Sequence, residues 1–354
     1  MKKLWYKIVR FFVSIGLHSS FKEIKAINAT AYPDNEAFLF VANHRNGLID
    51  PILIAVTQTH IFHFLTRASA FKNPLANFLL RSINMLPIFR IRDGKNSIQK
   101  NQAIFEACYR AFNQRESVLI FAEGNHGLPR RVRPLSKGFT RIAFGYLDQN
   151  PSKKLKIIPV GLNYSNMHHI GSSVHIYYGQ SILVNDYYNP KKEKEAIDSL
   201  KDKVYQELQK LTTHIEDLEQ HGIIEKNLIA QGVDFLNPNT ANQLIRETTQ
   251  WEKPVNLPEK GRSILQVIIS LLFRLNTFFP IMIWKILQKK VKDIVLQNTY
   301  KFGLSMVLIP LTYLIQSGIV SYFFGFQWGL LYLICSIIIL LIYKNTVYTD
   351  NRTT

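Results

Sequence analysis

The pattern of hydrophobic positions alternates between two periods in the first half of the chain. Between residues 36 and 185, short β-rich apolar runs are separated by stretches with apolar residues at helical spacing. Because the runs are apolar on both faces and helices lie between them, the pattern predicts an α/β domain. We expect a mixed, largely parallel sheet flanked by helices. The expected strands are residues 37–42, 61–66, 86–91, 118–122, 156–162 and 174–178, and the clearest helices are residues 97–114 and 138–149.

A long charged helix is expected after the last strand. Residues 190–217 carry apolar side chains at helical spacing, suited to packing on a sheet. Residues 218–258 are polar, contain three prolines and show only weak helical patterns. We therefore place the α/β domain at residues 26–217 and a small helical connector at residues 218–262.

The chain becomes much more apolar from residue 263 to residue 354. Residues 302–324 and 328–343 contain no charged side chain, and a short break separates them. This pattern predicts a transmembrane helical hairpin. Lys301 and Lys344 flank the hairpin, so the positive-inside rule puts both ends, and the domain before them, on the cytoplasmic side of an integral membrane protein.

Residues 263–287 precede the hairpin and are apolar but interrupted. Arg274 lies in the middle of the segment and Pro280 follows it. Both features disfavour a simple crossing, and we expect a broken re-entrant or interfacial segment.

The first 25 residues are amphipathic. Lys7 and Arg10 interrupt the apolar part, which is unlike a signal peptide. A helix would place a set of apolar residues on one face: Trp5, Ile8, Val9, Phe12 and Ile15. Two interpretations are open, a membrane-surface helix or a helix packed on the body of the domain.

The charge balance limits the classes of molecule that the protein is expected to bind. The 354 residues include 43 Lys and Arg against 25 Asp and Glu, a net charge of +18. Only +6 of this lies in residues 263–354, so the positive charge is not a tail. A basic protein can bind nucleic acid, an anionic membrane or a phosphorylated small molecule. The hairpin favours the last two, and no nucleic-acid motif appears.

Candidate chemistry begins directly after the first predicted strand. The segment Asn43-His44-Arg45-Asn46-Gly47-Leu48-Ile49-Asp50-Pro51 places a histidine and an aspartate about one turn apart. The imidazole of His44 can take a proton from a hydroxyl near neutral pH, and the carboxylate of Asp50 can orient it. Asp50 before Pro51 is also a good helix N-cap, which is the structural alternative.

Three further segments follow in order. Phe89, Arg90 and Arg92 lie at a predicted strand end, and the Glu123-Gly124 turn ends another strand. Glycines and cations near strand ends suit a phosphate, although a basic loop facing anionic lipid would look the same. The cations that follow Gly124 are Arg130, Arg131, Arg133, Lys137 and Arg141. In Ile158-Pro159-Val160, the proline predicts a strand at the edge of the sheet or a strand end.

Taken in order, these four blocks resemble the glycerolipid (glycerol-3-phosphate or 1-acylglycerol-3-phosphate) acyltransferase family, PlsC-like. That family has Asn-His, four residues, then Asp; Phe-x-x-Arg; Phe-Pro-Glu-Gly-Thr-Arg-Ser; and an apolar residue before Pro-Val. The resemblance covers about residues 30–215. The matching positions are Asn43, His44, Asp50, Phe89, Arg92, Phe121, Glu123, Gly124, Ile158, Pro159 and Val160.

The blocks also depart from the family pattern. Five residues separate His44 from Asp50, so one extra residue must be absorbed in the turn, for which Gly47 is a candidate. Ala122 replaces the usual proline. Asn125-His126 replaces Thr-Arg, so the charge of the third block's arginine would have to come from Arg130 or Arg131 nearby.

The resemblance implies a direct acyl transfer. His44, oriented by Asp50, would deprotonate the acceptor hydroxyl, which attacks the thioester of acyl-CoA or acyl-carrier protein. The implied acceptor is a phosphorylated glycerol, lysophosphatidate or glycerol 3-phosphate, and no metal or further cofactor is implied. The implied substrate-binding residues are Asn43, Phe89, Arg92, Glu123, Gly124, Arg130, Arg131 and Lys137.

One alternative stays open at the level of the sequence. The longer spacing between His44 and Asp50 would also fit a non-catalytic lipid-binding or remodelling membrane protein on the same fold.

Overall fold

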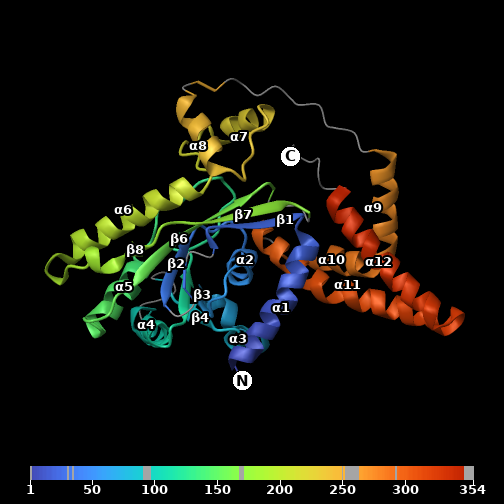
Figure 1. The fold of residues 1–354 in the computed structure, drawn as a ribbon, viewed down its shortest axis with the longest axis horizontal. Helices are drawn as coiled ribbons and strands as arrows, with labels where there is room; N and C mark the ends of the chain where they lie inside the picture. The colour runs from blue at the N-terminus through green and yellow to red at the C-terminus, as the bar shows by residue number, and fades with distance from the viewer. Residues whose placement is uncertain are drawn as a thin grey trace.

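The computed structural model shows an α/β domain followed by a group of apolar helices (Figure 1). It describes residues 2–29, 32–33, 36–90, 97–166, 171–248, 250–251, 263–291 and 293–346. The strands are β1 (Glu23–Ile27), β2 (Phe38–Ala42), β3 (Phe62–Arg67), β4 (Met85–Ile88), β5 (Ser117–Ile120), β6 (Lys156–Tyr164), β7 (Ser173–Tyr178) and β8 (Ile182–Leu183).

Within the described residues these strands form one sheet in the order β1-β7-β6-β2-β5-β3-β4, with β8 also paired to β6. Five of the strand pairings are parallel, and only β6 pairs antiparallel, with β7 and β8. The predicted mixed, largely parallel sheet is therefore confirmed.

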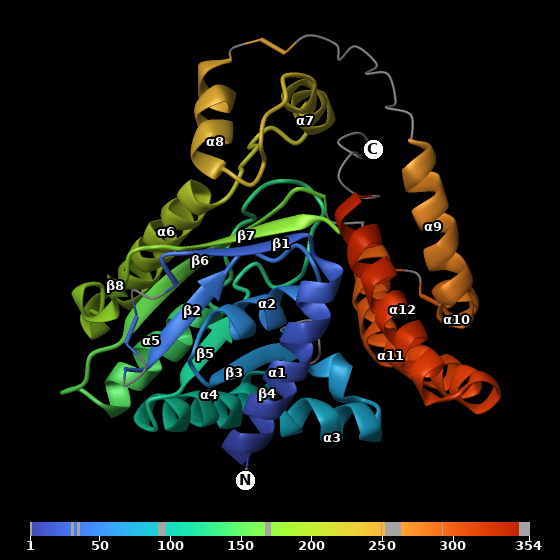
Figure 2. The same cartoon turned by 45° about the vertical axis from the view of Figure 1, so that its right-hand side comes forward.

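Helices cover both faces of the sheet (Figure 2). Helices α4, α5 and α6 pack on one face, and α1 and α2 pack on the other. The helices of the domain are α1 (Lys2–Ser20), α2 (Ile49–Thr57), α3 (Pro74–Ser82), α4 (Ser97–Asn113), α5 (Gly138–Gln149) and α6 (Glu193–Leu211), with short 3-10 helices at Ala68–Phe71, Val184–Asp186 and Pro190–Lys192.

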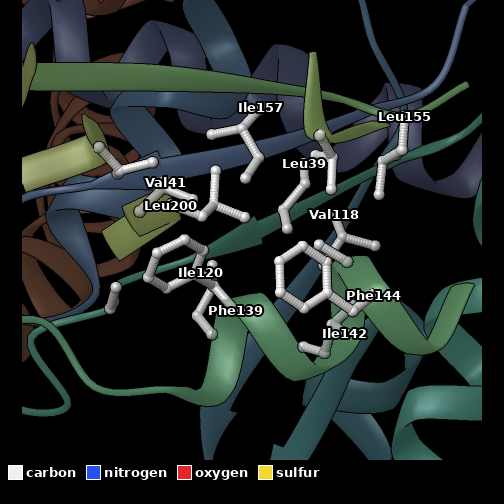
Figure 3. Packing of buried hydrophobic residues seen from close by; sticks show 14 of the residues in the cluster. Leu39, Val41, Val118, Ile120, Phe139, Ile142, Phe144, Leu155, Ile157 and Leu200 are labelled. Carbon is white, nitrogen blue, oxygen red and sulfur yellow. The ribbon is translucent and has the colours of Figure 1, made fainter. Parts of the chain in front are cut away.

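The larger core lies between the sheet and α4, α5 and α6, and Figure 3 shows its centre. Leu39 and Val41 of β2 point toward Phe139 and Ile142 of α5. The alternate residues Phe38 and Phe40 turn to the other face, where they join the second core. Strand β2 is thus buried on both faces, and this packing fixes the position of the residues that follow it.

Helix α1 belongs partly to the second core. Tyr6 and Leu17 on its inner side are buried against the sheet. On its outer side Phe11 and Phe12 are 62% and 61% exposed. The interpretation of a helix packed on the body of the domain therefore describes the inner face of α1. Its outer face is apolar and is not covered by other described residues.

Three elements depart from those predicted. Strand β1 was not expected because Glu23–Ile27 alternates polar and apolar residues, as an edge strand does. Strand β4 ends at Ile88, before Arg90. Helix α6 ends at Leu211 rather than residue 217, since the Asn163 side chain donates to the Leu211 carbonyl (2.8 Å) and accepts from the Thr213 amide (2.9 Å).

The prediction of an edge strand at Pro159 is wrong. Strand β6 lies inside the sheet, between β7 and β2. Residues 156–157 of β6 pair with β8 and residues 160–164 pair with β7, so Pro159 lies where β6 changes partners. A proline without an N–H is tolerated there because no antiparallel ladder bond is required of it.

The connector and the C-terminal region are helical. Helices α7 (His221–Ala230) and α8 (Pro238–Glu247) form a small cluster with Ile215 and Phe235. Residues 252–262, the end of the predicted connector, lie outside the described residues. Two later helices are long and apolar enough to cross a membrane: α11 (Ile294–Phe324) and α12 (Phe326–Thr346).

Two shorter apolar helices precede them, α9 (Ile264–Asn276) and α10 (Phe278–Gln288). They meet at an angle of 81°. The break falls at Thr277, one turn before Pro280, because the proline ring would clash with the carbonyl of Asn276 in a continuous helix. This geometry fits either a broken span or a re-entrant loop.

Candidate active site

The first and third sequence blocks meet at one edge of the sheet. His44 follows β2 and Glu123 follows β5, and these two strands are parallel neighbours. The carboxyl ends of parallel strands meet at the same edge, which is where ligands bind in open α/β sheets. The two blocks are also joined directly, because the Gly127 amide donates to the His44 carbonyl (3.1 Å).

The Asp50 carboxylate lies at the centre of this edge and is fully buried. His44 Nδ1 donates to its Oδ2 atom at 2.8 Å. The backbone amides of Arg45 and Asn46 donate to the same oxygen, each at 2.7 Å. The other oxygen, Oδ1, accepts a hydrogen bond from the hydroxyl of Tyr164.

The extra residue between His44 and Asp50 is absorbed without separating them. Gly47 adopts φ +26°, a conformation that favours glycine. The turn thereby curls back so that Asp50 begins α2 within hydrogen-bond distance of the imidazole. The longer spacing between His44 and Asp50, which suggested a non-catalytic protein, therefore does not break their hydrogen bond.

Tyr164 is the last residue of β6, on the opposite side of β2 from β5. Burial raises the pKa of its hydroxyl well above the ordinary value, and the adjacent Asp50 carboxylate raises it further. The hydroxyl therefore stays protonated and donates to Asp50. This hydrogen bond fixes the orientation of the carboxylate.

The imidazole of His44 has an aromatic ring on one side and a second histidine beside it. The Phe121 ring stacks on it, with ring centroids 4.1 Å apart and planes 23° from parallel. The His126 ring meets it edge-on at 5.8 Å. With Nδ1 bound to Asp50, the Nε2 atom is the one that can act as a base.

Glu123 is a buried carboxylate that holds the turn of the third block. Its side chain is 1% exposed, and Arg133 Nη2 lies 2.6 Å from its Oε2 atom. The backbone amide of His44 also donates to it. Burial raises the pKa of Glu123 to about 7, against the lowering effect of Arg133. Glu123 therefore positions the His44 backbone, and Gly124, at φ +75°, makes the turn possible.

The other residues of the first two blocks that were predicted to bind substrate do not lie beside His44 in one common arrangement. Asn43 is buried, and its side chain exchanges two hydrogen bonds with the Leu162 backbone (3.2 and 2.8 Å), which joins β2 to β6. Phe89 is half-buried after β4, with its backbone bound to the Asn101 side chain (2.9 and 2.7 Å). Arg92 lies outside the described residues.

The predicted cations of the third block separate into three environments. Arg130 is buried, its Nε atom donates to Glu225 (2.7 Å), and its Nη1 atom donates to the Tyr164 carbonyl (2.7 Å). These bonds tie α7 to the end of β6, so we leave Arg130 out of the proposed acceptor site. Arg131 is half-buried, and Lys137 is exposed at the start of α5.

The start of α11 also reaches this edge. The Thr299 hydroxyl accepts from the Leu48 amide (3.1 Å), and Asp293 pairs with His126 (3.0 Å). The apolar C-terminal region therefore contacts the loops of both the first and the third block.

Sequence reasoning missed four residues of this arrangement: Tyr164, Arg133 as the partner of Glu123, Thr299 and Asp293. Tyr164 had one signal, because it lies two residues beyond the predicted strand 156–162. The other three depend on how loops fold, which no local pattern encodes. Phe121 was recognised as a motif position, but its stacking on His44 was not.

Known proteins resemble this domain. Residues 23–163 match the family model described as Acyltransferase. The glycerol-3-phosphate O-acyltransferase 1 of Saccharomyces cerevisiae is 31% identical over 111 residues, which are 30% of this chain and 15% of that protein. An uncharacterized acyltransferase of Schizosaccharomyces pombe is 29% identical over 113 residues, 30% of this chain and 17% of that protein.

A solved structure is also similar, the 1-acyl-sn-glycerophosphate (LPA) acyltransferase PlsC from Thermotoga maritima. It is 16% identical, with a TM-score of 0.43, over 58% of this chain and 80% of that one. The chain spans less than a fifth of the length of the two curated yeast relatives. These matches indicate an acyltransferase domain at residues 23–163, similar to that of a glycerolipid acyltransferase.

Proposed function

We propose that this chain is a membrane-bound O-acyltransferase of phospholipid synthesis. It transfers a fatty acyl group from acyl-CoA or acyl-carrier protein to the hydroxyl of a phosphorylated glycerol, glycerol 3-phosphate or lysophosphatidate. The observation that carries the proposal is the His44–Asp50 pair, at 2.8 Å, on the carboxyl edge of the sheet. No cofactor beyond the acyl donor enters the proposal.

The proposed reaction is a single transfer with His44 as general base. As His44 Nε2 takes the proton of the acceptor hydroxyl, the oxygen attacks the thioester carbonyl. The new C–O ester bond forms and the C–S bond breaks. The proton then passes from the imidazolium to the departing thiolate, which leaves as a thiol. Asp50 stabilises the imidazolium that exists between the two proton transfers.

The proposed acceptor site lies beside this pair. Arg131, Lys137 and Arg92 are the cations proposed to hold the acceptor phosphate, with Arg92 placed by its sequence motif alone. The similarity to a yeast glycerol-3-phosphate O-acyltransferase supports glycerol 3-phosphate as the acceptor to test first. The proposed role of Glu123 and Gly124 is to hold the turn that lines the site.

The proposed membrane placement rests on the C-terminal helices. We propose that α11 and α12 cross the bilayer as a hairpin, with α9 and α10 as a re-entrant or interfacial segment. Lys301 and Lys344 flank the hairpin, which supports a cytoplasmic position for the acyltransferase domain.

The acceptor is tested by thiol release from acyl-CoA in membranes that contain the protein. Glycerol 3-phosphate, lysophosphatidate and lysophosphatidylcholine are offered separately, and membranes without the protein are the control. We expect release that depends on one of the two phosphorylated glycerols. Release only with lysophosphatidylcholine would contradict the proposed acceptor class. If no acceptor supports release from acyl-CoA, the assay is repeated with acyl-carrier protein, and failure there contradicts the proposed activity.

A further inference from the structure

Helix α3 presents an apolar face away from the protein. Leu75, Phe78 and Leu79 lie on one side of it and are 68%, 70% and 50% exposed. On another side, Leu80 packs against the second core. A helix on the surface of a water-soluble domain carries polar residues on its outward face. The outer face of α3 therefore differs from an ordinary surface helix.

This face adjoins a second exposed apolar face, on α1. Leu4, Phe11 and Ile15 of α1 are 65%, 62% and 51% exposed. Trp5 Nε1 donates to Ser82 Oγ (3.1 Å), which joins the two helices, and Figure 2 shows α3 beside the amino-terminal half of α1. Together the two faces form an apolar surface larger than single scattered side chains would make.

The charges that α1 and α3 themselves carry are all of one sign, and Glu116, from outside these helices, pairs with Lys3 at 2.8 Å. Residues 51–92 contain no Asp or Glu, and neither does α1. Arg67, Lys72 and Arg81 are exposed near α3. Apolar helix faces bordered by Lys and Arg bind the interfacial region of anionic membranes.

The surface is also continuous with the helices proposed to cross the membrane. Gly16 of α1 packs against Met306 of α11, where an added Cβ would lie 3.0 Å from the Met306 side chain. Lys344 Nζ at the end of α12 donates to the His18 carbonyl (2.8 Å). Since α1 lies between α3 and this hairpin, a bilayer around the hairpin would also reach α3.

We propose that the outer face of α3, formed by Leu75, Phe78 and Leu79, is a lipid-binding surface that enters the interfacial region of an anionic bilayer. The inference rests on the proposed function for the presence of the membrane and adds which surface meets it. Helix α3 follows β3, whose carboxyl end lies at the same edge as His44. Insertion of α3 therefore holds the catalytic edge against the lipid.

The test is site-specific fluorescence of the full chain in phosphatidylcholine and phosphatidylglycerol nanodiscs. A Phe78→Cys variant in a Cys335→Ser background carries an environment-sensitive probe, while Cys108 is buried and stays unlabelled. Because Phe78 is exposed, its replacement leaves the core unchanged. Ile315→Cys in α11 is the lipid reference, and Lys194→Cys in α6 is the water reference.

We expect the probe at position 78 to be quenched by brominated lipid to an extent comparable with position 315. We also expect an emission maximum at shorter wavelength than at position 194. Quenching by aqueous iodide equal to that at position 194 would overturn the inference. So would a disulfide between two copies of the unlabelled Phe78→Cys variant, because a second copy would then cover the face. If position 315 also escapes brominated lipid, the proposed membrane placement fails as well.

Discussion

Asp50 shows how single residues determine the site. Its carboxylate is buried and accepts hydrogen bonds from a histidine, two backbone amides and a tyrosine. An ionised carboxylate without these donors would be costly to bury, so the donors both stabilise it and fix its orientation. The imidazole it holds is then restricted to one tautomer. The proposed chemistry thus depends on Asp50 and Tyr164 as well as on the base itself.

Tyr164→Phe is expected to lower kcat about tenfold with little change in KM, because one of the donors to Asp50 is lost. The lost hydrogen bond leaves Asp50, and with it the imidazole, less firmly oriented. Steady-state kinetics with varied acceptor concentration measure kcat and KM separately.

Tyr178→Phe is the matched control for that variant. Tyr178 is buried on β7 and bonds to Thr57 (2.7 Å), so this change removes a buried hydroxyl at a distance from Asp50. An equal loss of kcat in both variants, or a change for Tyr164→Phe that appears only in KM, would contradict the positioning role.

Glu123→Gln should change how stability depends on pH. The folded chain holds the pKa of Glu123 at about 7, above its ordinary value of 4.5. As the pH rises through this interval, the unfolded chain releases the proton first, so the folded state loses stability. The stability of the wild type relative to Glu123→Gln should therefore fall by about 3 kcal/mol between pH 4.5 and 7. Thermal midpoints of both proteins in detergent measure it, and parallel pH profiles would contradict it.

At the scale of elements, the close approach of β6 and α6 shapes the domain. A Cβ at Gly161 would lie 2.2 Å from the carbonyl oxygen of Leu211 at the end of α6. The strand and helix can approach this closely only because the residue is glycine. The same contact brings the Asn163 side chain to the Leu211 carbonyl and ends the helix. Helix end and strand spacing are therefore determined together.

Gly161→Ala is expected to destabilise the folded chain by about 1–3 kcal/mol, since backbone atoms must shift to make room. The thermal midpoint in detergent should fall accordingly. Gly222→Ala in α7 is the control, because nothing lies within 4 Å of its Cβ position. A midpoint for Gly161→Ala as high as that of the control would contradict the close-packing account.

Most strands and helices could be predicted from the sequence, and those that were not predicted differ from the rest for physical reasons. Apolar runs located β2, β3, β5, β6 and β7 because strands buried on both faces differ sharply from their surroundings. Edge strand β1 and helix α3 were missed, since the first is half polar and the second is apolar on its outer face as well. Pro159 is tolerated inside the sheet because β6 changes partners there, and one of those partners, β8, is only two residues long.

The candidate site was predictable to the extent that it follows strand ends. His44, Asp50 and Glu123 lie together because the carboxyl ends of parallel β2 and β5 meet. The positions of the cationic side chains that follow Gly124 could not be predicted in the same way. Whether Arg130 faces solvent or Glu225 depends on where α7 packs, and that is decided by contacts far apart in the sequence.

At the scale of the whole molecule, the apolar helices and the catalytic edge form one arrangement. Thr299 of α11 contacts the His44 loop, and Asp293, directly before α11, contacts His126 in the loop after Glu123. Helix α1 packs on both the sheet and the hairpin. A bilayer around α11 and α12 would therefore lie close to the proposed site, as suits the proposed acyl transfer to a lipid precursor.

The most direct test of the account compares acyl transfer to a phosphorylated glycerol by the wild type, His44→Ala and His18→Ala. His18 lies on α1 and bonds to the Ser14 carbonyl (2.8 Å), so it controls for the loss of a histidine outside the site. The measurement is acceptor-dependent formation of the ester and release of the thiol, in membranes with matched protein levels. If His44 is the general base, the rate of acyl transfer should fall roughly a hundredfold or more in His44→Ala and stay unchanged in His18→Ala. Transfer by His44→Ala at the rate of the wild type would contradict it.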